Sequence, residues 1–204
     1  MKTTILRTLI LALSLFFSNA ALAQNDPQQT LQASLDELVS EFTAKRSEFE
    51  ADKSKLYAFA ERAIDDNWDF GKMAQLVLGK NWRRIDDDQK ARFTEAFKDL
   101  MVRTYSTTMF KYTGKEAIEL ETPIYKGKDN KRAVVNASGD LGDGSEPIPL
   151  SFSMFLDIDD AWRIYNISAA GISLVTTYRS SYGQIIAAKG IDSLIDSINA
   201  KTEG

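Results

Sequence analysis

The sequence contains no histidine and no cysteine. These two absences exclude Ser-His-Asp triads, cysteine nucleophiles, thiolate zinc sites and imidazole proton shuttles, and they also exclude disulfide bonds. The apolar N-terminal segment stops short of a transmembrane span, because Ser14, Ser18 and Asn19 interrupt it before the roughly 20 residues that such a helix needs. What remains favours a protein that binds over one that catalyses.

The first residues have the layout of a secretory signal peptide. Lys2 and Arg7 precede an apolar run over residues 9–17, and small residues follow up to Ala23. We expect residues 1–23 to be the signal peptide, cleaved after Ala23. A lipoprotein would have a cysteine directly after the cut, where this chain has Gln24. The mature chain, residues 24–204, fits a single domain of ordinary size that is free in solution.

The charge balance narrows the range of partners. Removing Lys2 and Arg7 from the 25 basic side chains leaves 23 against 29 acidic ones, a net charge of −6. This charge argues against nucleic acid as a partner and opposes adsorption to anionic lipid surfaces. We therefore expect contact with membranes to go through protein partners, unless a local basic patch overrides the total.

Helices are indicated by apolar residues that recur at spacings of three and four. The strongest signal starts at Asp86, a helix N-cap residue with Gln89 three positions later, which is a variant of the capping box. The C-terminal segment divides into two helices, with a break between residues 187 and 190. The predicted helices span residues 27–46, 53–65, 68–78, 86–112, 172–187 and 190–201.

Short runs of alternating polarity follow Gly114, divided by turn-forming residues. In one of them, Phe152 and Met154 alternate with Ser151 and Ser153, so one face is apolar and the other is wetter. Helices before and after such a segment indicate an α+β fold, with N-terminal helices, an antiparallel four-stranded sheet and C-terminal helices, and with helices packed on one sheet face. The predicted strands span residues 116–122, 131–138, 148–157 and 161–168.

Three charged clusters have more than one interpretation. The carboxylates of residues 86–88 could hold a metal, but capping and the helix dipole explain them better. The aspartates of residues 157–160 lack the ligand spacing of an EF-hand loop and fit a tight turn. Lys80, Arg83 and Arg84 either meet a phosphate or an acidic partner, or form a solvated face.

Several blocks of the sequence resemble the MlaC family, also called toluene-tolerance auxiliary proteins, and their order and spacing are more specific than any one of them. The segment WDFGKMA with VLGKNW resembles the first signature block, and the helix from Gln89 to Tyr105 fits the next. The segment WRIYNI with GISL and YRS resembles the sheet-to-helix junction, and GID resembles the tail. Asn166 and Ala170 depart from the acidic residues that the family usually has there, which puts any role of those carboxylates in doubt.

The resemblance implies a periplasmic phospholipid carrier and not an enzyme. Its expected partners are phospholipid, an outer-membrane lipoprotein complex and an inner-membrane transporter subunit with an MCE domain, and the transport maintains the lipid asymmetry of the outer membrane. It implies a monomer without metal or cofactor, with phospholipid as cargo. The acyl tails would lie in an apolar pocket between helices and sheet, and the head group would stay near solvent.

Burial of the tails fits such a role, because each methylene is worth roughly 0.8 kcal/mol and two tails of about sixteen carbons would cost on the order of 20 kcal/mol or more to expose. Flexible methionines suit tails of varied length, and Arg179 is a candidate for head-group contact. The same apolar residues could instead be ordinary core, as in a structural adaptor. A further alternative is a small enzyme on a similar cone-shaped fold, with a pocket carboxylate and a tyrosine. The candidate lining residues are Phe70, Met73, Val77, Phe97, Met101, Tyr105, Met109, Leu150, Phe152, Met154 and Ile164.

Overall fold

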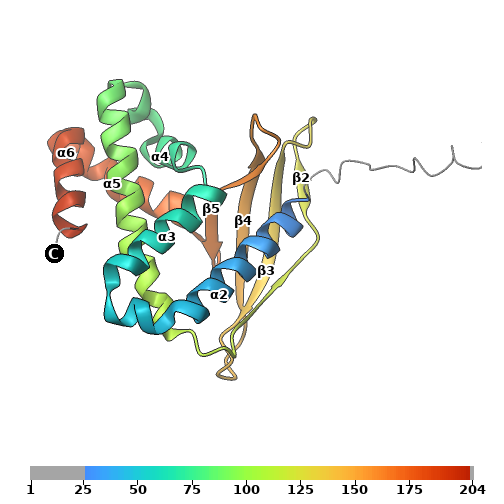
Figure 1. Cartoon of the computed structure of the whole chain (residues 1–204). Helices are drawn as coiled ribbons and strands as arrows, with labels where there is room; N and C mark the ends of the chain where they lie inside the picture. The colour runs from blue at the N-terminus through green and yellow to red at the C-terminus, as the bar shows by residue number, and fades with distance from the viewer. Residues whose placement is uncertain (1–25, 203–204) are drawn as a thin grey trace, which may run out of the picture.

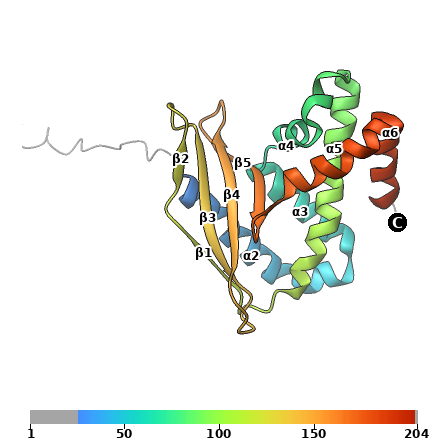
Figure 2. The same ribbon diagram turned by 180° about the vertical axis from the view of Figure 1, so that it is seen from behind.

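A computed structural model describes residues 26–202 of the chain. The predicted signal peptide and its cleavage site lie outside the described residues. Helices and an antiparallel sheet form two sides of the molecule, and one long helix runs across the sheet (Figures 1 and 2). This arrangement confirms the predicted α+β class.

Six helical segments were expected, and the observed ones agree closely with them. The long N-terminal helix ends at Asp52, whose carboxylate also caps the next helix through the backbone N–H of Ser54. The helices are α2 (Pro27–Ala51), α3 (Lys53–Asn67), α4 (Phe70–Leu78), α5 (Asp87–Ser106) and α6 (Leu174–Thr202), with the 3₁₀ segments η1 (Gly79–Arg83) and η2 (Thr107–Lys111). None of the described helices is long and apolar enough to cross a bilayer.

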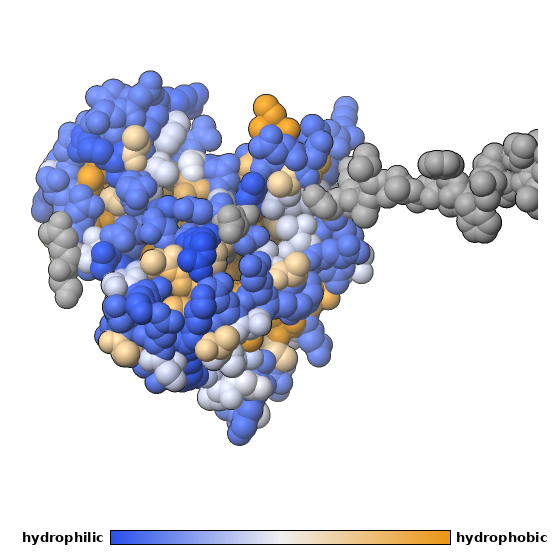
Figure 3. Space-filling view, viewed as in Figure 1, coloured by the Kyte–Doolittle hydropathy of each residue, from blue (hydrophilic) through white to orange (hydrophobic). Residues whose placement is uncertain are grey.

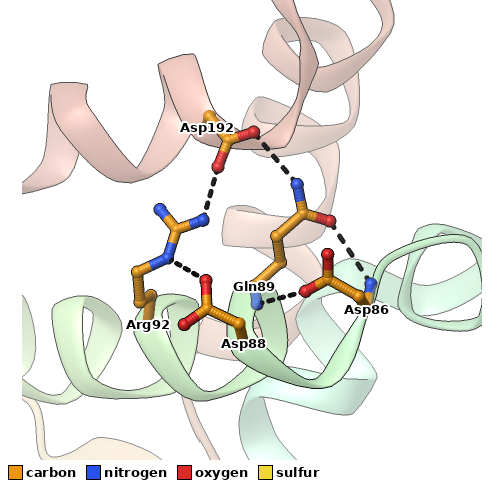
Figure 4. Close-up of polar contacts among 5 residues, drawn as sticks. All are labelled: Asp86, Asp88, Gln89, Arg92 and Asp192. Carbon is orange, nitrogen blue, oxygen red and sulfur yellow. Dashed lines mark hydrogen bonds and ion pairs between the residues drawn. The ribbon is translucent and has the colours of Figure 1, made fainter.

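Local chemistry explains where these helices start and stop. The predicted capping box is present at α5, where the Asp86 carboxylate accepts from the backbone N–H of Gln89 at 2.8 Å and the Gln89 side chain accepts from that of Asp86 (Figure 4). Gly190 has φ 83° and ψ 173°, so α6 consists of two helices across a kink, as the sequence predicted. Helix α4 begins two residues later than expected, because Trp68 is extended and Asp69 is the N-cap.

The sheet has six strands, two more than expected. Its order is β1-β3-β4-β5-β6, and β2 also pairs with β3, all antiparallel. The strands are β1 (Ala117–Leu120), β2 (Ile124–Lys126), β3 (Arg132–Asp140), β4 (Ile148–Leu156), β5 (Trp162–Ala169) and β6 (Ile172–Ser173).

Both additional strands are short. The first predicted strand is followed along the same edge of β3 by β2, and Pro123, which lacks the backbone N–H needed for strand pairing, stands in the gap between them. Strand β6 replaces the expected first turn of α6, because Ile172 and Ser173 pair with β5 through a tight turn at Ala170 and Gly171. Helix α6 therefore begins at Leu174, directly beside the sheet.

The buried apolar residues fall into three clusters. A helical cluster joins α4, α5 and α6 and includes Phe93 and Leu194. A sheet cluster joins β3, β4 and β5 to Leu31 of α2. A third cluster, which includes Phe42, lies between α2 and α3. Trp68 packs against both the helical cluster and the sheet cluster, so it marks the seam between them.

Candidate functional site

A cavity of about 590 Å³ opens between the helices and the β5–β6 end of the sheet. This volume lies within the range of about 300–1,000 Å³ that is typical of small-molecule sites. The space-filling view shows apolar surface between the helical part and the sheet part, bordered by hydrophilic residues (Figure 3). The lining consists of Ile64, Trp68, Phe70, Met73, Met101, Tyr105, Ile167, Ala169, Ile172, Leu174, Thr177 and Tyr178.

A second cavity of about 230 Å³ adjoins the first, under α2. Ile64, Trp68, Met101 and Tyr105 line both cavities, so the two hollows share a boundary formed by these four residues. The other lining residues of the second cavity are Leu31, Ser34, Leu35, Leu38, Ala60, Ala63, Asn67, Val102, Ser106, Met109, Phe152 and Ile164.

The walls of the main cavity come from two separately packed parts of the molecule. Phe70, Met73 and Met101 belong to the helical cluster, whereas Ile167 packs on the sheet cluster. Trp68 is fixed at the seam by a parallel bridge to Ile164 and by the backbone N–H of Asp69, which donates to the carbonyl of Ile164 at 2.9 Å. The hollow therefore lies between two cores and is not a defect inside one.

Neither lining includes a charged side chain among the residues that the structure describes. The few polar groups of the smaller cavity mostly bond to one another: Ser34 Oγ donates to Asn67 Oδ1 at 2.5 Å, and Asn67 Nδ2 donates to the carbonyl of Ala63 at 3.0 Å. The exception in this lining is Ser106, whose buried hydroxyl has no hydrogen-bond partner in the described chain. An interior of this kind accepts apolar matter and offers little to a charged ligand.

Two tyrosines line the helical side of the main cavity. Tyr105 is 47% exposed and stands between the two cavities. Burial, and after it the neighbouring Tyr105, raises the pKa of Tyr178 far above its ordinary value. Burial likewise raises the pKa of Tyr182, which packs on Tyr178 with ring centroids 5.2 Å apart. The raised pKa keeps the hydroxyls of Tyr178 and Tyr182 protonated at neutral pH.

The structure brings together some of the predicted lining residues and leaves others in the core. Phe70, Met73, Met101 and Tyr105 line the main cavity, and the smaller one adds Met109, Phe152 and Ile164. Four others line neither cavity: Val77 and Phe97 are buried in the helical cluster, Met154 is buried in the sheet cluster, and Leu150 packs against the sheet cluster.

Sequence reasoning missed much of the lining at the sheet end of the cavity. Ala169, Ile172 and Thr177 are exposed at its rim and belong to no long apolar stripe. Leu31, Leu35 and Leu38 fall within the predicted helix 27–46 and lie on one face of α2, but nothing in their spacing says whether that face meets packed side chains or a hollow.

Arg179 lies outside both linings. Its Nε donates to the backbone carbonyl of Leu76 at 2.6 Å, and Nη2 bonds to the same oxygen, so the guanidinium satisfies a carbonyl near the end of α4. The side chain also rests on Gly79, where the guanidinium Nε is 3.6 Å from the position that a Cβ would occupy. In this conformation Arg179 joins α6 to α4.

Asn166 and Ala170, the two departures from the family pattern, lie beside the cavity rim. Asn166 Oδ1 accepts from Ser173 Oγ at 2.9 Å and from the backbone N–H of Val175 at 3.1 Å, which caps the start of α6. Asparagine and aspartate are equally good N-cap residues, so this capping role does not need an acid. Ala170 has φ 49° and Gly171 φ 78°, so both turn residues of the β5–β6 hairpin are left-handed.

The other charged clusters have local roles. Asp157 Oδ1 accepts from the backbone N–H groups of Asp159 and Ala161, and Asp157 Oδ2 accepts from Arg163 Nε, all at 2.8–2.9 Å, so turn chemistry accounts for it. Asp86 serves in the capping box, and the described residues contain no group of three or more side chains placed to hold a metal.

Comparisons with known proteins give one consistent result. The sequence model of a family described as MlaC protein matches residues 32–200. The intermembrane phospholipid transport system binding protein MlaC of Haemophilus influenzae is 23% identical over 179 residues, covering 87% of this chain and 83% of that protein. The toluene tolerance protein ttg2D of Pseudomonas putida is 22% identical over 190 residues, covering 93% and 86%.

A solved structure shares the fold. The phospholipid-binding protein from Ralstonia solanacearum, determined in complex with a phospholipid, matches with a TM-score of 0.76 at 20% sequence identity. The match covers 87% of this chain and 97% of that one.

Proposed function

Because this chain belongs to the MlaC protein family, we propose that it is a phospholipid carrier that encloses the acyl tails in the cavity between helices and sheet. The observation that carries the proposal is an uncharged, apolar hollow of about 590 Å³ that a boundary of four residues separates from a second one. Both curated relatives are named for transport or tolerance, and the structural neighbour binds a phospholipid. The expectation that the chain is not an enzyme agrees with them.

The cavity chemistry fits tails better than head groups. At roughly 0.8 kcal/mol per buried methylene, transfer of two tails from water into the cavity gives a large favourable free energy. The linings contain no described Lys or Arg for a phosphate, so the head group stays at the rim near Ala169, Ile172 and Thr177, which are exposed. The lining residues then contribute shape and apolarity, and Met73 and Met101 adapt to tails of different length.

The sequence and the family support a proposal for the route of transport. We propose that residues 1–23 direct export and are removed, and that residues 24–204 work as a monomeric single domain in the periplasm. The carrier takes lipid between an outer-membrane lipoprotein complex and an inner-membrane transporter with an MCE domain. Spontaneous release into water is unfavourable by the same free energy that holds the tails, so loading and unloading require contact with these partners.

The two rival functions lack support from the cavity. An enzyme with a pocket carboxylate and a tyrosine needs both groups together, but neither lining includes an aspartate or glutamate among the side chains described. A structural adaptor needs no hollow, whereas this interior keeps two. Binding without turnover is the function that the lining supports best.

Organic extraction of the purified protein, followed by mass spectrometry, tests the proposal. We expect diacyl phospholipid in a fixed ratio to protein. Protein that carries no lipid, and takes up none from phospholipid vesicles after delipidation, would contradict the carrier function.

A matched pair of variants locates the cargo. Thr177 lines the main cavity at its rim, whereas the adjacent Thr176 is also exposed and lines neither cavity. Thr177→Trp should fill the entrance and reduce extracted lipid, and Thr176→Trp should leave it unchanged, with both proteins folded by circular dichroism. Equal lipid content in the two variants would show that the lipid does not enter through this rim of the main cavity, which would contradict the proposal.

A further inference from the structure

A third cavity lies on a different side of the helical part, between η1 and α6. Its volume is about 570 Å³, close to that of the main cavity, and it shares no lining residue with either of the other two. Helix α6 contributes to both regions through different faces: Leu174, Thr177 and Tyr178 face the main cavity, whereas residues 180, 183, 184 and 187 form a separate stripe along the third cavity.

Cations without carboxylate partners set this hollow apart. Lys80 and Arg84 line it, and neither forms an ion pair within the part of the chain that the structure describes. The lining contains no acidic side chain, in a protein with an excess of acidic residues. Two positive charges that line one hollow and form no described ion pair favour an anionic ligand there.

The acidic residues nearest in the sequence are already engaged. Asp192, next to the lining residue Ile191, accepts from Arg92 at 2.7 Å and from Gln89 at 3.0 Å, and Asp88 accepts from the same arginine at 2.7 Å (Figure 4). Asp86 holds the capping box. Asp192 ties the second half of α6 to α5, and none of the three carboxylates lines the third cavity.

The remaining lining is a mixture of neutral polar and aliphatic groups. Asn81, Ser180 and Gln184 offer hydrogen bonds beside the two cations, and no bond of their side chains to another described residue competes. The aliphatic residues of the lining are Ile85, Ile186, Ala187 and Ile191. Gly183 keeps the space open, because a Cβ there would meet no atom within 4 Å.

We propose that this third cavity is a second ligand site, which binds a phosphate group that carries a short apolar substituent. Lys80 and Arg84 neutralise the phosphate, the amide and hydroxyl groups orient it, and the aliphatic residues receive the substituent. The phosphate belongs either to a soluble phosphomonoester or to a lipid head group. The site stands independently of the tail cavity, since the two share no residue.

The first probes are butyl phosphate and inorganic phosphate. Each is titrated into the full mature protein, and binding is monitored by ¹H–¹⁵N correlation spectra. We expect saturable shifts at Ser180 and Gln184, and tighter binding of butyl phosphate than of inorganic phosphate because of the aliphatic residues. The backbone signals of Thr177 and Tyr178 should not follow the titration. Shifts confined to those two residues, or no saturable shift, would overturn the site.

Four variants distinguish a specific phosphate site in the cavity from nonspecific electrostatic binding of phosphate to the surface. The double variant Lys80→Ala, Arg84→Ala should bind butyl phosphate with an affinity lower by roughly tenfold or more. Gly183→Leu should weaken it equally by filling the space, in a protein that is still folded because leucine is a better helix former than glycine. Arg83→Ala removes one positive charge from an exposed neighbour outside the lining, and we expect little change in affinity, whereas Arg84→Ala alone should weaken binding. Equal losses in Arg83→Ala and in the double variant would overturn the proposal.

Vesicles identify the source of the phosphate. In flotation experiments we use phosphatidylcholine vesicles that contain phosphatidic acid. If the wild type floats with the vesicles and the double variant does not, the phosphate that the site binds is that of a lipid head group. Binding of butyl phosphate without such flotation would assign a soluble ligand. Failure of both probes would overturn the second site, while the lipid content of the tail cavity would still report separately on the proposed carrier function.

Discussion

The capping of α6 gives a quantitative prediction at Asn166. Its side-chain oxygen accepts from Ser173 Oγ and from the backbone N–H of Val175, and Ser173 Oγ accepts from the backbone N–H of Thr176 at 3.2 Å. Two of the unpaired N–H groups at the helix start are thus satisfied by two linked side chains. Asn166→Asp keeps the acceptor and adds a negative charge at a helix N-terminus, and Asn166→Ala removes the acceptor.

The magnitudes follow from this geometry. A carboxylate near a helix N-terminus is worth about 0.3–1 kcal/mol at low ionic strength, so Asn166→Asp should raise the free energy of unfolding by that amount. Loss of a capping side chain typically costs about 1 kcal/mol, so Asn166→Ala should lower it. Ser173→Ala should show a coupling of about 0.5–1.5 kcal/mol with Asn166→Ala, because the two side chains share a hydrogen bond.

Urea unfolding, followed by tryptophan fluorescence at pH 7, measures these differences. With a slope of about 1–3 kcal/mol per molar urea, a change of about 1 kcal/mol moves the midpoint by roughly 0.3–1 M. The gain in Asn166→Asp should shrink when salt is added, since the dipole interaction is screened. An aspartate variant less stable than the wild type, or an alanine variant of equal stability, would refute this account of capping.

Three further predictions concern the turn, the acid response and the core. Ala170→Asn should raise the free energy of unfolding by about 0.5–1 kcal/mol, and with it the melting temperature, because asparagine tolerates the left-handed φ of 49° better than alanine. An unchanged melting temperature would count against backbone strain at this position. The hydrogen bond from Arg163, and after it that from the backbone of Ala161, lowers the pKa of Asp157. Its stabilising contribution is therefore complete above the unfolded value of about 4 and is lost as the pH falls through the lowered folded value, so Asp157→Asn should be less stable than the wild type at pH 7, and the gap should close toward pH 2 in urea titrations. Val77→Ala should cost about 1–3 kcal/mol of stability and leave the extracted lipid unchanged, since Val77 is core and lines neither cavity; a parallel loss of lipid would contradict that placement.

Features with a local cause could be predicted from the sequence. The capping box at Asp86 and a break between the last two helices depend on residues close in the chain; both are present, the break at Gly190. Strand β6 escaped prediction because two residues carry no periodic signal, and it forms only when β5 is beside it. Trp68 was expected to open a helix, but its bridge to Ile164 holds it in an extended conformation.

The division between lining and core could not be predicted in the same way. Met73 and Val77 lie four residues apart on one face of α4 and are equally buried, yet only Met73 reaches the cavity. Periodicity identifies the face that leaves water, but the crossing of α4 over α5 and α6 decides what that face meets. The family resemblance supplied the expectation of a pocket, and the separate helical and sheet clusters supply its physical basis.

The seam marked by Trp68 has a mechanical consequence. Each side of the hollow keeps its own tightly packed neighbours, so the two sides can slide or tilt against each other by a shear motion without unfolding either one. The space offered to a guest is thus set by the spacing of two preassembled blocks. A displacement along this boundary would leave both clusters packed, and its cost would fall on the backbone bridge between Trp68 and Ile164 that crosses the seam.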